Sequence, residues 1–187
     1  MPTRGSRFPP WLALISFMSL GFAVACRSDG PTAPTVVPGP GLGAGPSASV
    51  FTTGPLAVPI AAAMERAILD EYHAEAIYSR VLEDLGNVIP FANVIHAEAR
   101  HSESIARVYR NHEMAVPEDP WHRDNVPRFR SVPEACAAAA VEEEKNIAMY
   151  DELLRMELPD DVRRVFTTNR LASLEAHLPA FRFCAGG

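Results

Sequence analysis

The 187-residue chain is long enough for one domain of ordinary size plus additional sequence, which lies at the N-terminus. The formal net charge is −6 and there is no basic cluster, which argues against a nucleic-acid partner. We place the folded domain at residues 57–187.

The first 25 residues have the order of a secretory signal. Basic residues precede an apolar stretch from Trp11 to Ala25, and this stretch ends in small residues. Cys26 follows directly, as in lipoprotein signals, where the cysteine after the cleavage point receives the lipid. An ordinary signal peptide and an uncleaved anchor are the alternatives. We predict a signal peptide at residues 1–25, lipidation of Cys26, and an exported, membrane-anchored lipoprotein of the cell envelope, on its periplasmic or extracellular face.

Residues 26–56 are rich in Pro, Gly, Ser, Thr and Ala and have little apolar surface to bury. This composition predicts a disordered tether between the membrane and the domain. Nothing in the sequence specifies the contacts of a cage, so we expect a monomer or a dimer.

Four helices of similar length are expected after the tether. Their ranges are 57–85, 91–113, 133–157 and 159–183. A proline stands at the expected first turn of three of them: Pro90, Pro133 and Pro159. The first and last links are short, which favours antiparallel neighbours, whereas the longer middle link permits a crossover. Pro179 lies inside the last range and should kink or end that helix early.

Each expected helix has a stripe of core positions at alternating steps of three and four residues. These stripes contain five ionisable residues, Glu71, Glu98, His101, Glu143 and His177. An isolated charge is too costly to bury, so such groups must be neutralised, paired or bound to metal. Glu98 and His101 are three residues apart, so both side chains point the same way and can bind neighbouring metal ions.

The two halves of the domain also echo one another. Glu71 is followed seven residues later by Tyr78, and Glu143 is followed seven residues later by Tyr150. Each tyrosine is placed to hydrogen-bond a carboxylate and orient it as a ligand. The alternative is that both are core aromatics with a polar end.

These stretches resemble the ferritin-like superfamily, in particular the ferritin-like domain-of-unknown-function 2202 family. The segments that carry the resemblance are Glu71 to Tyr78, Phe91 to Ala99 with His101, Glu143 to Tyr150, and His177-Leu178 with Phe181. The resemblance covers roughly residues 57–183 and implies an all-α, ferritin-like up-down four-helix bundle with a crossover between helices 2 and 3. It also implies a two-metal site with Glu71 as a terminal ligand, Glu98 as the bridge with His101 as its partner, and Glu143 and His177 as the second half.

The last helix departs from that pattern. A complete di-iron motif would have a glutamate three residues before His177, where this chain has Leu174. Glu175 is expected to turn away, and Glu144 beside Glu143 is a candidate substitute ligand. A symmetric site with two bridging carboxylates is therefore in doubt.

Cys136 opens the third expected helix and Cys184 follows the fourth. If these helices are antiparallel neighbours, the two ends are adjacent and a disulfide fits. Disulfides persist in exported proteins.

The predicted function is metal binding at a carboxylate and histidine site, with two iron ions expected and manganese or zinc as other metals. Metal-dependent oxidation or metal handling would follow from such a site. One alternative is a non-catalytic protein that holds a single ion. Another is a structural bundle in which the same five residues form a fully satisfied hydrogen-bond network without metal.

Overall fold

The computed structural model describes residues 54–186. The predicted signal peptide, Cys26 and almost all of the tether lie outside these residues. Within them the chain is helical, with α1 (Val58–Leu85), α2 (Phe91–Asn111), a short 3-10 helix η1 (Arg123–Asn125), α3 (Val132–Leu153), α4 (Asp160–Ala172), a π-helical turn η2 (Ser173–His177) and α5 (Leu178–Cys184). No helix in this part of the chain combines the length and the apolar character needed to cross a bilayer. Since α4, η2 and α5 follow one another directly, the domain is a bundle of four helical rods.

The helix ends carry the local signals that stop and start helices. Gly86 follows α1 with a φ of 88°, a backbone conformation that glycine adopts without steric cost. The Ser131 hydroxyl accepts a hydrogen bond from the Glu134 amide and caps the start of α3. Helices α2 and α3 end two and four residues before the predicted boundaries, since helix boundaries are the least certain part of a prediction from sequence.

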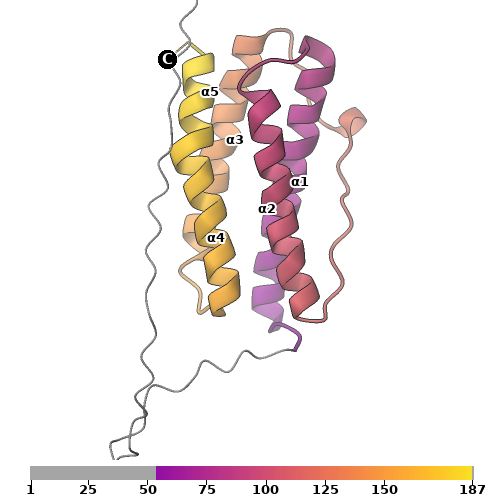
Figure 1. Ribbon diagram of the computed structural model, residues 1–187, viewed down its shortest axis with the longest axis vertical. Coiled ribbons are helices and arrows are strands. Elements are labelled where there is room, and N and C mark those ends of the chain that lie inside the picture. The colour runs from indigo at the N-terminus through magenta and orange to yellow at the C-terminus, as the bar shows by residue number, and fades with distance from the viewer. Residues whose placement is uncertain (1–53, 187) are drawn as a thin grey trace, which may run out of the picture. The chain divides into compact units, whose positions relative to one another are not determined.

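The helices pack as two antiparallel pairs, α1 with α2 and α3 with the rod formed by α4, η2 and α5 (Figure 1). The link at residues 112–131 runs along α1. Its Trp121 indole donates a hydrogen bond to the Leu69 carbonyl at 3.2 Å, and its Arg128 guanidinium contacts the Asp84 carboxylate at 3.1 Å. The link therefore carries the chain back along the bundle, so that α2 and α3 start at the same end.

The core consists of two hydrophobic clusters with a polar layer between them. One cluster includes Met64, Ile68, Ile105, Leu153 and Phe166. The other includes Val81, Phe91, Val94, Cys136 and Phe181. Burying each large apolar side chain contributes roughly 1.5–3 kcal/mol, so the clusters hold the four rods together on both sides of the polar layer.

The last rod does not end early, so that part of the prediction for Pro179 is wrong. Pro179 lies in the first turn of α5, directly after the π turn Ser173–His177, and the helix continues to Cys184. A π turn shifts the backbone hydrogen-bond ladder by one residue. The missing amide donor of Pro179 therefore falls where the regular ladder is already interrupted.

A disulfide joins Cys136 near the start of α3 to Cys184 at the end of α5, with 5.8 Å between the two Cα atoms. It closes a loop that contains almost the whole second antiparallel pair. The bond fixes the C-terminal end of the last rod to α3.

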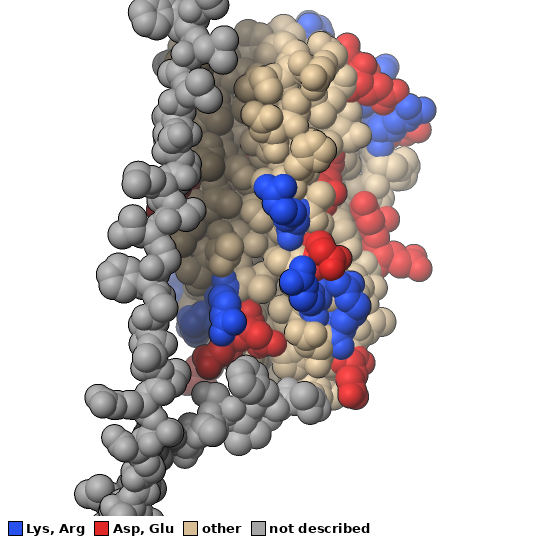
Figure 2. All heavy atoms as spheres, viewed as in Figure 1, with Lys and Arg blue, Asp and Glu red and all other residues tan. Residues whose placement is uncertain are grey.

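Basic and acidic side chains lie interspersed on the face drawn in Figure 2 rather than in patches of one sign. Oppositely charged side chains on the surface form several exposed ion pairs, such as Arg66 with Glu152 at 2.9 Å. Exposed pairs of this kind contribute about 0–1 kcal/mol each, so the bundle depends on its core rather than on its surface charges.

Candidate metal centre

The polar layer brings together the five ionisable residues that the stripes contain. Glu71 comes from α1, Glu98 and His101 from α2, Glu143 from α3 and His177 from the π turn, and all five are buried. Their ligand atoms form two groups in which all members lie within 4.8 Å of one another. Glu71, Glu98 and His101 form the first group, and Glu98, Glu143 and His177 form the second. We refer to these as the Glu71 half-site and the Glu143 half-site; Glu98 belongs to both.

The Glu71 half-site is closed. His101 Nδ1 lies 2.9 Å from Glu98 Oε2 and 3.3 Å from Glu71 Oε2. The Tyr150 hydroxyl donates a hydrogen bond to Glu71 Oε1, and Asn169 Nδ2 donates to the same oxygen at 3.4 Å. Both oxygens of this fully buried carboxylate therefore have polar neighbours.

The Glu143 half-site is less completely paired. His177 Nδ1 lies 3.0 Å from Glu98 Oε1, at an angle that is not that of a hydrogen bond, and 3.6 Å from Glu143 Oε1, which is beyond hydrogen-bond distance. The Tyr78 hydroxyl donates to Glu143 Oε1 at 2.8 Å. A buried nitrogen without a hydrogen-bond partner is costly and rare. Its position beside two carboxylate oxygens fits an imidazole that ligates a metal.

The two tyrosines support the carboxylates in a reciprocal way. Tyr78 lies on α1 and bonds Glu143 of α3, whereas Tyr150 lies on α3 and bonds Glu71 of α1. Each tyrosine thus orients the carboxylate of the opposite helix rather than the one that precedes it in sequence. The seven-residue echo in the sequence corresponds to this exchange across the bundle.

The cluster is strongly coupled electrostatically. Burial raises the pKa of Glu71 to about 7. Burial would lower the pKa of both histidines, but the adjacent carboxylates outweigh it and raise the pKa of His101 to about 10 and that of His177 to about 9. Burial would also raise the pKa of Glu98, yet the hydrogen bond from His101 and the adjacent His177 imidazole outweigh burial and lower it. Without metal, both imidazoles are therefore cationic at neutral pH, and a bound cation must displace one proton from each.

The π turn decides which residue occupies the position of the fourth glutamate. Leu174, three residues before His177, is 38% exposed, whereas Ser173, four residues before it, is 1% exposed. A π turn contains one residue more than an α-helical turn, so the residue four before His177 faces inward with it, and the residue three before it does not. The Ser173 hydroxyl donates to Asn146 Oδ1 at 2.9 Å and does not belong to either half-site.

Neither acidic neighbour in sequence replaces the fourth glutamate. Glu144, the candidate substitute, is exposed and forms an ion pair with Arg182 at 2.7 Å, so that prediction is wrong. It follows Glu143 by one residue, and one step along a helix turns a side chain by about 100°. Glu175 is exposed, as expected.

Sequence reasoning missed two buried amides, Asn146 and Asn169. Asn146 Nδ2 donates to Asp70 Oδ2 at 2.7 Å, and Asn169 Nδ2 contacts the Glu71 half-site. Asn146 stands three residues after Glu143, and Asn169 stands three residues after Phe166. Both therefore stand at helical spacing from a core residue, and this spacing was the signal that could have identified them as buried.

No protein-family model, no curated protein and no solved structure matches the chain. The interpretation of the centre therefore depends on its donor atoms and their geometry. Three carboxylates and two imidazoles form an oxygen-rich set, which suits iron and manganese and is less suited to copper.

Proposed function

We propose that this protein binds two metal ions, iron or manganese, at a dinuclear centre in which Glu98 is the bridging ligand. One observation carries the proposal. Glu98 directs Oε2 at His101 Nδ1 at 2.9 Å and Oε1 at His177 Nδ1 at 3.0 Å. One carboxylate whose two oxygens face two different histidines is the arrangement that a bridging ligand requires. The unpartnered Nδ1 of His177 supports the same reading.

The proposal includes a ferritin-like architecture. Helices α2 and α3 start at the same end of the bundle, so the link at 112–131 would be the crossover of that fold. The resemblance found in the sequence supports this assignment. Fold alone does not give an activity, so the function is argued from the centre.

The chain's own residues would hold the ions and shield them. Glu71, Glu98, His101, Glu143 and His177 would be the ligands, and Tyr78 and Tyr150 would fix the orientation of two carboxylates. The hydrophobic clusters would shield the polar layer from solvent on two sides. A bound pair of redox-active ions would supply oxidation chemistry with oxygen or peroxide; storage or handling of metal needs only the binding.

A metal-free structural network is the less favoured alternative. Such a network is tolerated when every buried polar group has a partner. His177 Nδ1 does not meet this condition in the described part of the chain. A single-ion site uses only one of the two half-sites, and metal stoichiometry separates it from the dinuclear centre.

The test is elemental analysis of the purified full chain, beside a Glu98→Ala/His101→Ala double variant. A Glu103→Ala/His96→Ala variant is the matched control, because it removes an exposed glutamate and an exposed histidine from the same helix. We expect about two iron or manganese ions per chain in the wild type and in the control, and none in the first variant. One ion per chain would favour the single-ion alternative. No ion after reconstitution with iron, manganese and zinc would sink the proposal.

Export and anchoring through Cys26 are a separate part of the proposal. Incorporation of a labelled fatty acid into the wild-type chain, but not into a Cys26→Ala variant, would support them. An unlabelled wild-type chain would contradict them.

A further inference from the structure

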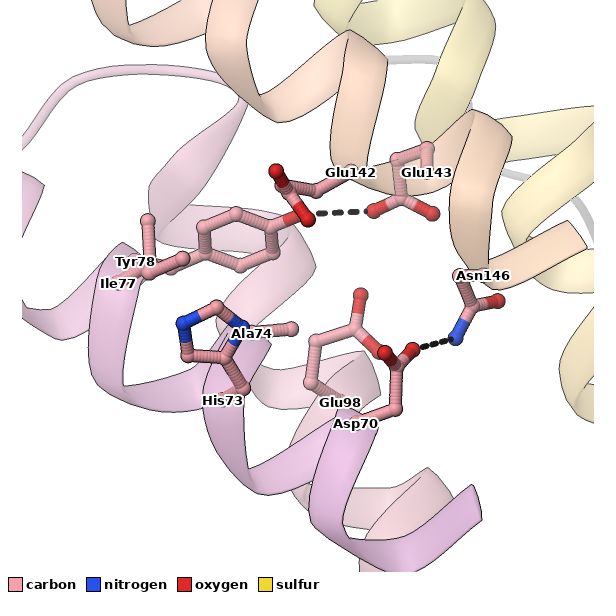
Figure 3. A pocket seen from close by; sticks show the side chains of 9 residues that line it. All are labelled: Asp70, His73, Ala74, Ile77, Tyr78, Glu98, Glu142, Glu143 and Asn146. Carbon is pink, nitrogen blue, oxygen red and sulfur yellow. Dashed lines mark hydrogen bonds between the residues drawn. The ribbon is translucent and has the colours of Figure 1, made fainter. Parts of the chain in front are cut away.

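A small pocket lies between α1 and α3 and reaches the metal centre (Figure 3). Its cavity volume is about 20 Å³, enough for one water molecule or one ion. Asp70, His73 and Glu142 line it and are half-buried, so they form its rim. Glu98 and Glu143 also line it but are buried, at 2% and 3% exposure, so they form its floor.

The pocket reaches only one half-site directly. Glu143 and Tyr78 line it together with the shared Glu98, whereas Glu71 and His101 do not. His177 does not line it either, but its Nδ1 lies 3.0 Å from Oε1 of Glu98, which does. Glu71 has no exposed surface. A cation that arrives from solvent through this pocket therefore meets the Glu143 half-site first.

The rim of the pocket is acidic and partly held in place. Asp70 Oδ2 accepts a hydrogen bond from Asn146 Nδ2 at 2.7 Å, drawn as a dashed line in Figure 3. This bond engages one carboxylate oxygen and orients the group at the pocket. Glu142 contacts Lys145 Nζ at 2.8 Å, so part of its charge is compensated. Asp70 is therefore the rim residue best placed to attract a cation.

An independent observation points to a ligand at the floor of the pocket. The buried Nδ1 of His177 has no hydrogen-bond partner, and it lies beside floor oxygens of Glu98 and Glu143, 3.0 Å and 3.6 Å away. A cation that passes the rim would find two carboxylates and an imidazole nitrogen in reach.

We propose that divalent cations reach the buried centre through the pocket between α1 and α3, that Asp70 is the positioning residue at its mouth, and that the Glu143 half-site fills before the Glu71 half-site. This inference rests on the proposed dinuclear function. It adds a route, an order of filling and a residue that is not a ligand of the centre.

The test is stopped-flow mixing of the metal-free full chain with cobalt(II), whose visible absorption reports ligation. Asp70→Asn removes the charge and keeps an oxygen acceptor for Asn146. Glu144→Gln is the matched control, because it removes one negative charge from α3 at an exposed site outside the pocket. Charge that steers an ion changes its association rate, so we expect loading to slow roughly three- to tenfold in Asp70→Asn with the same final absorbance, and no such change in the control.

A second variant tests the route by size rather than by charge. Ala74 lines the pocket, and Ala74→Leu would fill it. We expect slow loading with an unchanged final amount of bound cobalt. Circular dichroism checks that the variant is folded; if it is not, the Asp70→Asn result decides.

The order of filling has its own readout. We expect two phases of cobalt binding in the wild type, with His177→Gln removing the fast phase and His101→Gln removing the slow one. Wild-type rates in both Asp70→Asn and folded Ala74→Leu would overturn the route, and the reverse assignment of phases would overturn the order. If the wild-type chain binds no cobalt, iron, manganese or zinc at equilibrium, the proposed function fails and the route fails with it.

Discussion

The two half-sites are built from the same residue types but differ in how they are enclosed. In the Glu71 half-site, Tyr150 and Asn169 both donate to the Glu71 carboxylate, and neither Glu71 nor His101 lines the pocket between α1 and α3. In the Glu143 half-site, Tyr78 is the hydroxyl donor, and the carboxylate borders a pocket. The same pattern of residue types has therefore produced one closed position and one accessible position.

The last helical rod contributes to this difference. It supplies Asn169 to the Glu71 half-site, whereas its π turn brings Ser173 inward where a fourth glutamate would stand. An echo between two halves of a sequence thus does not make the two halves of a site equivalent. Helices α1 and α3 each contribute a glutamate and a tyrosine seven residues later, but the side chains that the other helices place around them differ.

The largest expected effect comes from the residue that the half-sites share. Glu98→Gln should reduce bound metal from about two ions per chain to a trace, because both positions lose a charged ligand. His101→Gln and His177→Gln should each remove about one ion. Elemental analysis measures all three, with Glu175→Gln as an exposed control on the turn that contains His177. An equal loss of bound metal in all three variants would contradict the division of the centre into two half-sites.

The next effect is a loss of stability in alkaline solution for the metal-free protein. Burial raises the pKa of Glu71 to about 7, and neighbouring carboxylates raise the pKa of His101 to about 10 and that of His177 to about 9, despite burial. The folded state therefore binds more protons than the unfolded state. The histidine contribution is complete below pH 6.5, the ordinary histidine pKa, and is lost as pH rises through about 9 to 10.

We expect the free energy of unfolding of the metal-free chain to fall by about 2–4 kcal/mol between about pH 6 and pH 10. Thermal melts across this range measure it, at roughly 2–4 °C per kcal/mol for a domain of this size. Bound metal replaces the imidazole protons, so the metal-loaded chain should show a smaller fall. A melting temperature that is constant or rises across this range in the metal-free chain would contradict the electrostatic description of the cluster.

A smaller effect separates the two tyrosines. Tyr150→Phe should destabilise the metal-free chain by about 1–3 kcal/mol, since Glu71 is fully buried and loses a donor. Tyr78→Phe should cost about 0.5–1.5 kcal/mol, because a water molecule in the adjoining pocket can replace the hydroxyl at Glu143. Urea unfolding at neutral pH compares them. The opposite order would mean that the Glu71 half-site is not the more enclosed one.

The smallest expected effect tests the register of the π turn. Leu174→Glu restores the sequence spacing of a complete di-iron motif, but position 174 faces outward. We expect unchanged metal content and a change in stability within about 0.5 kcal/mol, as for other surface substitutions. A third ion, or a clear increase in metal affinity, would show that position 174 faces the centre.

The helices were predictable because several signals agree. Prolines at the expected first turns and stripes at steps of three and four residues identify the same four segments that the structure contains. Pro179 misled the prediction because its effect depends on the π turn before it. A π turn has no hydrophobic period of its own in a sequence, and packing against the other helices sets the one-residue shift.

The charged residues of the centre were predictable because a charged residue at a core position of a helix stands out in the sequence. Glu71, Glu98 and Glu143 stand in phase with apolar neighbours, and buried carboxylates demand compensation. Asn146 and Asn169 occupy equivalent phases but carry no charge, so the same argument does not single them out. The difference between the half-sites arises from these neutral groups and from the pocket, which depend on tertiary packing.

The most direct test of the central claim is an anomalous difference map from crystals of the full chain loaded with manganese, recorded where manganese scatters anomalously. We expect two peaks that share Glu98, one beside Glu71 and His101 and one beside Glu143 and His177. A single peak would contradict the dinuclear centre, and no peak in a well-ordered bundle would contradict metal binding altogether.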